Sequence, residues 1–231
     1  MPIHNCRSET TREQLVHDFD IEPLVHVALM NGNTIDSCTG KTLEREYYVF
    51  SYMNKNNQHD TGTFVCGITA ANDFITLLSR NNPTIRRLPL FDPFPFIQAG
   101  QNNAINRVNN GRGAQQTAIW NSIAKELYDA IGMICIMWNL TNVGGALESV
   151  LINLTRNPNQ IPSESDIRSI NTIIHNKFQH GNPPQASLSS CFYQFLLNQG
   201  VILPNQIQFP NLTQHFINNV ANDYNRYPYF N

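Results

Sequence analysis

Three side chains in the second half of the chain, Arg168, His175 and His180, have the types and spacing to act on a phosphodiester. Arg168 and His175 are seven residues apart, so on a helix they lie about two turns apart on one face. A histidine can move the proton of a ribose 2′-hydroxyl, while an arginine or a second histidine stabilises the charge of a five-coordinate phosphate. The stretch therefore predicts metal-independent RNA cleavage. The alternative is a helix end whose histidines cap carbonyl groups.

Residues 175–181, HNKFQHG, resemble the Arg-Asn-x-x-x-His motif of HEPN-family helical domains. His175 stands where that family has its arginine, and Arg168 offers an arginine upstream at an alternative spacing. The resemblance takes in residues 114–231 as a helical bundle. It implies a ribonuclease that needs no cofactor for catalysis, or a catalytically degenerate relative. Its partner would be RNA, and the site would be assembled across a homodimer.

Cysteines in the first half suggest a second kind of site. Cys6, Cys38, Cys66 and His59 offer the four ligands of a tetrahedral zinc ion, and hairpins can gather such ligands from distant positions. Residues 63–78, a strand leading through Cys-Gly into a helix, resemble the second knuckle of a treble-clef zinc finger. Cys66 at the helix start could instead be a nucleophilic thiolate. The remaining alternative is that the cysteines are buried and serve as small hydrophobic side chains.

Basic residues are concentrated in the middle of the chain. Residues 80–125 carry a net charge of +5, between −5 for residues 1–79 and −2 for the remainder. Guanidinium groups pair bidentately with phosphate oxygens, so this band could bind nucleic acid. Alternatively, its arginines pair with the acidic first segment. The predicted nucleic-acid-binding residues are Arg80, Arg86, Arg87, Arg107 and Arg112.

The elements that must position these residues indicate an α+β protein. Residues 25–29, 47–52 and 63–66 are rich in β-branched and aromatic side chains and predict short strands, with residues 54–62 as a polar turn. A helix capped by Thr69 follows. The Pro- and Asn-rich residues 80–113 indicate a connector. We therefore expect a mixed strand and helix domain at 1–79, a connector at 80–113 and a helical domain at 114–231.

One helix is especially well marked. Apolar residues recur at intervals of three and four, which places them on one face. Its central members, Leu127 and Ile131, should be buried. Further helices are predicted at 146–154, from Ser163 onward, at 188–196 and at 216–224. The residues of the repeat are Ile119, Ile123, Leu127, Ile131, Ile134 and Trp138.

Composition excludes several classes of protein. Hydrophobic residues make up 41% of the 231, which excludes wholesale disorder, whereas charged residues make up only 14%. The first twenty residues lack the apolar core of a secretion signal, and charged residues interrupt the longest apolar stretch, so no membrane contact is expected. Five widely spaced cysteines predict a cytoplasmic protein. Glycine-rich phosphate loops, GxSxG and HExxH are absent from the sequence.

These patterns lead to two hypotheses of different class. The first is an RNA-directed HEPN-like protein, either a metal-independent endoribonuclease or a catalytically degenerate relative. The second is a non-catalytic adaptor or binding protein whose first half is stabilised by zinc. A hydrolase that uses Cys66 is third.

Overall fold

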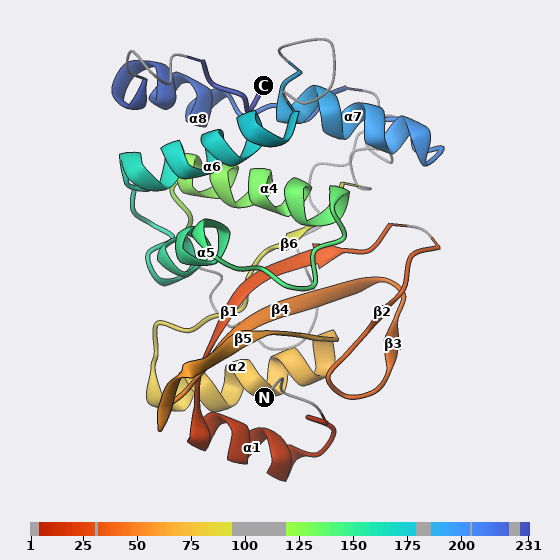
Figure 1. Cartoon of the computed structure of the whole chain (residues 1–231), viewed down its shortest axis with the longest axis vertical. Helices are drawn as coiled ribbons and strands as arrows, with labels where there is room; N and C mark the ends of the chain where they lie inside the picture. The colour runs from red at the N-terminus through yellow and green to blue at the C-terminus, as the bar shows by residue number, and fades with distance from the viewer. Residues whose placement is uncertain (1–4, 31, 94–118, 179–185, 204, 222–226) are drawn as a thin grey trace.

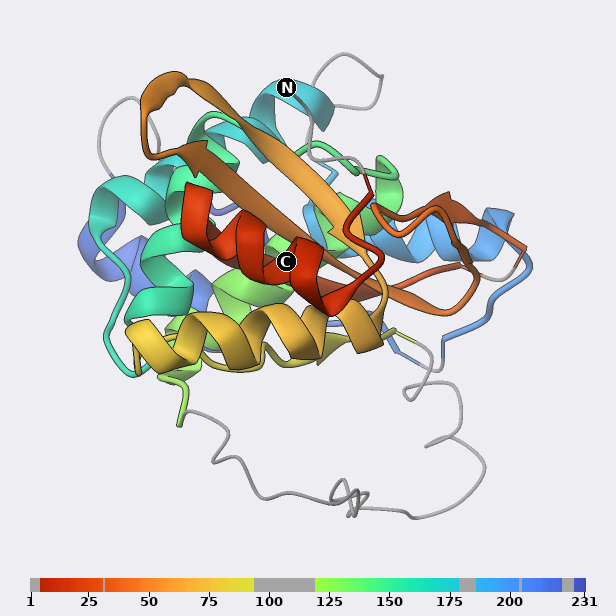
Figure 2. The same cartoon turned by 90° about the horizontal axis from the view of Figure 1, so that it is seen from below.

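The chain forms an α+β fold in which helices cover both faces of a four-stranded sheet (Figure 1). The computed structural model describes residues 5–30, 32–93, 119–178, 186–203, 205–221 and 227–231. Helices α1 (Glu9–Asp18) and α2 (Ile68–Asn81) lie side by side on one face of the sheet (Figure 2). Helices α4 (Ser122–Met137) and α5 (Ala146–Arg156) cover the other face.

The sheet has the strand order β5-β4-β1-β6. Strand β1 (Phe19–Ala28) pairs antiparallel with β4 (Glu46–Asn54), which pairs antiparallel with β5 (Asn57–Cys66). Strand β6 (Leu90–Phe91) joins β1 in parallel. A separate ribbon consists of β2 (Ile35–Asp36) and β3 (Thr42–Leu43). The three predicted strands are confirmed. Strands β4 and β5 contain the predicted residues and are longer, whereas β1 begins earlier than predicted and ends at Ala28, one residue before the predicted end.

The predicted turn at residues 54–62 was wrong in its extent. Strand β4 ends at Asn54 and β5 begins at Asn57, so the turn consists of Lys55 and Asn56. The side-chain oxygen of Asn54 accepts a hydrogen bond from the backbone N–H of Asn56, which closes this turn. The polar residues that follow belong to an edge strand that faces solvent, so their polarity does not report a loop. His59 is therefore a strand residue.

The helices that follow the connector agree with the apolar repeats. Asn121 caps α4 by accepting hydrogen bonds from the N–H groups of Ile123 and Ala124. Ser163 accepts from the N–H of Asp166 at the start of α6 (Glu164–Phe178). Helix α7 spans Leu188–Asn198. The last predicted helix begins earlier, as α8 (Pro210–His215), and continues as the π-helical turn η1 (Phe216–Val220). Among these described helices, none is long and apolar enough to cross a bilayer.

Leu127 and Ile131 are completely buried, as predicted. Ile119 is 87% exposed because α4 begins only at Ser122, so its assignment to the apolar face was wrong. The buried residues of the described chain form one hydrophobic cluster that runs through both predicted domains. Tyr128 of α4 shows how the two predicted domains are joined: its hydroxyl donates to the carbonyl of Pro89 and accepts from the N–H of His26.

The connector contributes to this joint, because Phe91 of β6 packs against Gly132 of α4. A Cβ atom on Gly132 would lie 2.7–2.9 Å from the Cβ, Cγ and Cδ1 atoms of Phe91. These atoms are at the start of the Phe91 side chain, close to its backbone, so they cannot easily move away from an added methyl group. We expect Gly132→Ala to lower the free energy of unfolding by about 1–3 kcal/mol, although alanine is the better helix former. Urea denaturation measures this change. Gly144→Ala, where the added methyl group meets open space, is the control. Equal stability of Gly132→Ala and the parent would contradict this packing.

Candidate functional site

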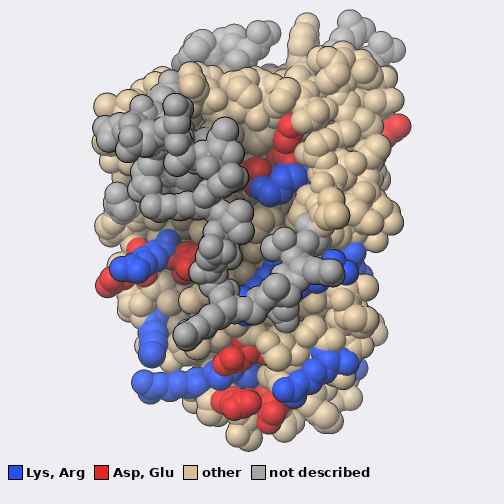
Figure 3. All heavy atoms as spheres, turned by 180° about the vertical axis from the view of Figure 1, so that it is seen from behind, with Lys and Arg blue, Asp and Glu red and all other residues tan. Residues whose placement is uncertain are grey.

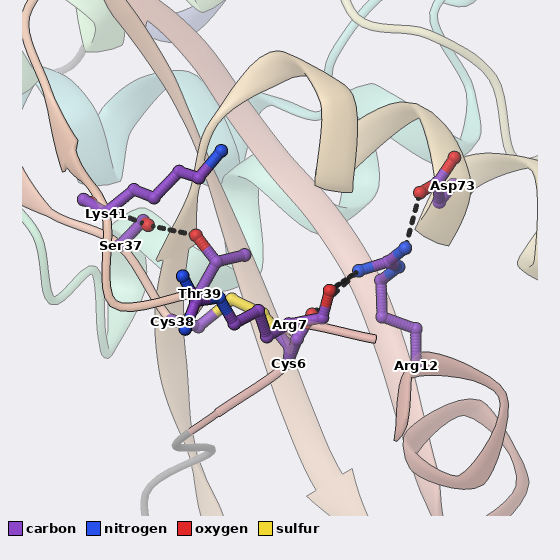
Figure 4. The surroundings of a disulfide bond; sticks show 8 residues. All are labelled: Cys6, Arg7, Arg12, Ser37, Cys38, Thr39, Lys41 and Asp73. Atoms are coloured by element: carbon purple, nitrogen blue, oxygen red, sulfur yellow. Dashed lines mark hydrogen bonds and ion pairs between the residues drawn. A yellow bond between two sulfur atoms is a disulfide. The ribbon is translucent and has the colours of Figure 1, made fainter. Parts of the chain in front are cut away.

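A pocket of about 480 Å³ opens between the start of α2, the β2–β3 ribbon and the residues that precede α1. Its charged lining consists of three basic residues, Arg7, Arg12 and Lys41, and one acidic residue, Asp73. Figure 4 shows these side chains around a disulfide bond. They come from three separate segments of the chain, so their proximity is a property of the fold.

The disulfide joins Cys6 to Cys38, with 5.5 Å between their Cα atoms. The N–H of Cys6 donates to the carbonyl of Cys38 (2.9 Å), and the N–H of Cys38 donates to the carbonyl of Val65 in β5 (2.8 Å). These contacts fix the segment before α1 and the β2–β3 ribbon to the sheet. Arg7 directly follows Cys6, and Lys41 lies three residues after Cys38. The disulfide therefore lies within three residues, along the chain, of both basic side chains.

Arg12 of α1 ties the same segment to α2. It is only 8% exposed, and its Nη1 donates to the carbonyls of Cys6 (2.8 Å) and Arg7 (3.0 Å). Its Nη2 forms an ion pair with Asp73 of α2 at 2.7 Å. Arg12 thus neutralises the one acid in the pocket. Neither Arg7 nor Lys41 forms an ion pair with any residue that the structure describes, so the pocket keeps an excess of positive charge.

The N-terminus of α2 adds to this positive field. Its N-cap residue is Gly67 rather than the predicted Thr69, and no side chain caps it. The first turn contains no acidic residue. The N–H groups of the first turn have no partner within the helix, and the helix dipole places a partial positive charge there. A Cβ on Gly67 would lie 2.8 Å from the Cδ2 of Leu43, so glycine allows the ribbon to approach the helix closely.

Apolar groups form the rest of the wall. Leu43, Ile68 and Ala70 line the pocket, and Ile68 is 39% exposed although it is large and hydrophobic. Cys66, immediately before Gly67, is fully buried. Burial raises the pKa of its thiol far above the ordinary value, so the nucleophilic thiolate is disfavoured at neutral pH. The site can hold an anionic group next to an apolar one, and it offers no activated nucleophile.

The structure does not bring the four predicted zinc ligands together. Two of them, Cys6 and Cys38, form the disulfide, in which neither sulfur is a thiolate. Cys66 is buried, and His59 lies exposed in β5, seven residues away along the same strand. Within the described residues, no group of three or more His, Cys, Asp or Glu side chains could hold a metal ion.

Two of the residues predicted for RNA cleavage lie on α6 and face the C-terminal segment. The Nη2 of Arg168 donates to the carbonyl of Val220 (3.3 Å), and the ring of His175 lies 4.8 Å from that of Tyr229. The Nε of Arg168 and the Nδ1 of His175 are buried without a hydrogen-bond partner. His180 lies outside the described residues.

The predicted basic band is described only in part. Arg80, at the end of α2, and Arg86 and Arg87 beyond it are exposed. None of them forms an ion pair within the described chain, so the predicted pairing with the acidic first segment is not seen there. Arg107 and Arg112 lie outside the described residues. On the face drawn in Figure 3, most charged side chains lie over the half formed by the sheet, α1 and α2.

Sequence patterns did not reveal the pocket. Arg7, Arg12 and Lys41 belong to no motif, and helix α1, which carries Arg12, has almost no apolar periodicity. Two signals were available. Ser8 caps α1 by accepting from the N–H of Thr11, and such a cap can be read from sequence. The helix after Cys66-Gly67 starts without an acid, which is a mark of an N-terminus open to an anion.

The model of a protein family described as "Uncharacterised conserved protein UCP028583" matches residues 4–180. The matched range contains every residue that lines the pocket, as well as Arg168, His175 and His180. It ends before α7. No curated protein and no solved structure matches the chain.

Proposed function

The chain belongs to the family of uncharacterised conserved proteins UCP028583, and we propose its function from the geometry of its own pocket. We propose that the protein binds a small phosphate-bearing molecule in this pocket. The observation that carries the proposal is the pair of basic side chains, Arg7 and Lys41, that face the uncapped N-terminus of α2 without an acidic partner in the described chain. A dianionic phosphate matches two cations and the first-turn N–H groups.

The size and lining of the pocket favour a phosphate joined to an apolar group. A volume of about 480 Å³ is within the range of sites for small organic ligands and exceeds what a phosphate ion alone would fill. Leu43 and Ile68 offer the apolar contact surface. The proposed function agrees in class with the second hypothesis from the sequence, a non-catalytic binding protein. In the structure, a disulfide between Cys6 and Cys38 links residues that were expected to bind zinc.

Isothermal titration calorimetry with phenyl phosphate tests the proposal. We expect Arg7→Gln and Lys41→Gln each to weaken binding by about tenfold or more, since each removes a charged hydrogen-bond donor to the phosphate. Arg80→Gln is the matched control, because it removes an exposed cation from the opposite end of the same helix. Binding should also weaken as salt rises. Absence of heat with the parent, or equal losses in all three variants, would contradict the proposal.

RNA cleavage by α6 is a second candidate function. The observation that favours it is the pair of buried, unpartnered nitrogen atoms of Arg168 and His175 on one helix face, because such atoms in a native protein call for a functional or structural explanation. Exposed Arg86 and Arg87 could then hold the RNA by its phosphates. Incubation of the protein with generic RNA in EDTA tests this function. His175→Ala should lose cleavage, and Thr172→Ala, an exposed change on the same helix, should keep it. No cleavage by the parent would remove the candidate.

A further inference from the structure

We infer that the redox state of the Cys6–Cys38 disulfide controls binding in this pocket, so that the oxidised protein is the binding form. The inference rests on the proposed phosphate site and adds its regulation. It starts from the position of the disulfide, whose two cysteines each precede a basic residue of the pocket by a short stretch of chain.

The disulfide joins the two walls that carry the free positive charges. Arg7 stands one residue after Cys6, while Thr39 and Lys41 follow Cys38 in the loop of the β2–β3 ribbon (Figure 4). Apart from the disulfide, the described residues show one backbone hydrogen bond between these two segments, from the N–H of Cys6 to the carbonyl of Cys38. The covalent bond is therefore the strongest direct link between the two segments, each of which is also held to the rest of the fold, the first by Arg12 and the second by the hydrogen bond from Cys38 to Val65.

Once the disulfide is broken, electrostatic repulsion acts to separate Arg7 from Lys41. Arg7 and Lys41 carry like charges, and the positive end of α2 faces the same space. Without an anion, these groups repel one another, and the loop at Thr39 gains freedom to move away. A phosphate needs both cations together, so it binds the restrained form more tightly. The rest of the fold remains held, because Arg12 still bonds to the carbonyls of Cys6 and Arg7.

The chemical step is thiol–disulfide exchange with a dithiol reductant. Cys38 is half-buried whereas Cys6 is fully buried, so the thiolate of the reductant attacks the Sγ of Cys38, and Cys6 leaves as a thiolate that takes up a proton. The second thiol of the reductant then attacks the mixed disulfide and releases Cys38. Two electrons and two protons pass to the protein, and the reductant becomes a cyclic disulfide. Cys66 takes no part in this exchange, because burial raises the pKa of its thiol and keeps it protonated.

The test compares phenyl phosphate binding by the oxidised protein and by the protein reduced with dithiothreitol, which is uncharged and does not compete for the pocket. We expect reduction to weaken binding by about tenfold, within the usual range of coupling between two sites. The double variant Cys6→Ser, Cys38→Ser should bind like the reduced protein and ignore the reductant. Cys191→Ser, which removes a free cysteine of α7, should respond as the parent does.

Two further readouts do not depend on the variants. Coupling is reciprocal, so saturating phenyl phosphate should lower the reduction potential of the disulfide by about 30 mV for a tenfold difference in affinity. Trypsin should cut after Arg7 and Lys41 faster in the reduced protein, while circular dichroism shows the fold intact. If the oxidised protein fails to bind phenyl phosphate, the proposed function itself is overturned. If both forms bind equally, or if reduction unfolds the chain, the redox control is overturned and the pocket remains.

Discussion

Reduction of the Cys6–Cys38 disulfide should lower the free energy of unfolding by about 3–4 kcal/mol, because the bond closes a loop of 32 residues and so restricts the unfolded chain. Urea denaturation with and without dithiothreitol measures this loss. Domains of this kind are stable by about 5–15 kcal/mol, so we expect the reduced protein to remain folded at room temperature. The effect should be seen as a lower midpoint with a steeper slope, because the unfolded chain is more expanded without the bond.

The double variant Cys6→Ser, Cys38→Ser separates the disulfide from the other cysteines. It should show the lower stability at once and no further response to reductant. The three free cysteines, Cys66, Cys135 and Cys191, should contribute nothing to the response, because none has a disulfide partner in the structure as described. A parent whose midpoint does not move on reduction would show that the bond adds no stability.

Leu127→Ala should lower the free energy of unfolding by about 2–5 kcal/mol, since truncation removes buried apolar surface and leaves a cavity that the neighbours fill only in part. Leu127 is completely buried in the middle of α4, where that helix meets the rest of the core. Urea denaturation again gives the value.

Ile119→Ala is the matched control for this prediction. It belongs to the same apolar repeat but is 87% exposed, so its truncation should change stability by less than about 0.5 kcal/mol. Equal effects of the two truncations would mean that the face of α4 is assigned wrongly.

The comparison of these two residues shows what the sequence could predict. A repeat at intervals of three and four identifies the buried face of a helix, and Leu127 and Ile131 follow that rule. The repeat does not show where the helix begins, because an apolar side chain such as Ile119 continues the pattern beyond the cap at Asn121. The boundary depends on capping contacts and on where the chain leaves the core.

The candidate site depends on contacts that no local pattern encodes. Five cysteines allow many pairings, and the sequence does not say that Cys6 and Cys38 meet. Their meeting depends on the β2–β3 ribbon folding back onto β5, where the N–H of Cys38 bonds to Val65. The charge count placed the expected binding surface in the basic middle band, whereas the pocket draws Arg7 and Lys41 from the acidic first segment.

The cover that α4 provides for the sheet has a consequence for biosynthesis. Tyr47 of β4 is almost fully buried, and its hydroxyl donates to the carbonyl of Leu140, just beyond α4. Roughly 70 residues separate the end of β5 from the end of α4. At about 5–20 residues per second, the ribosome needs roughly 4–14 s to make that stretch. During this interval the nascent sheet presents one apolar face to water or to a chaperone, so release of the chain before Leu140 should yield an aggregating fragment rather than a folded half.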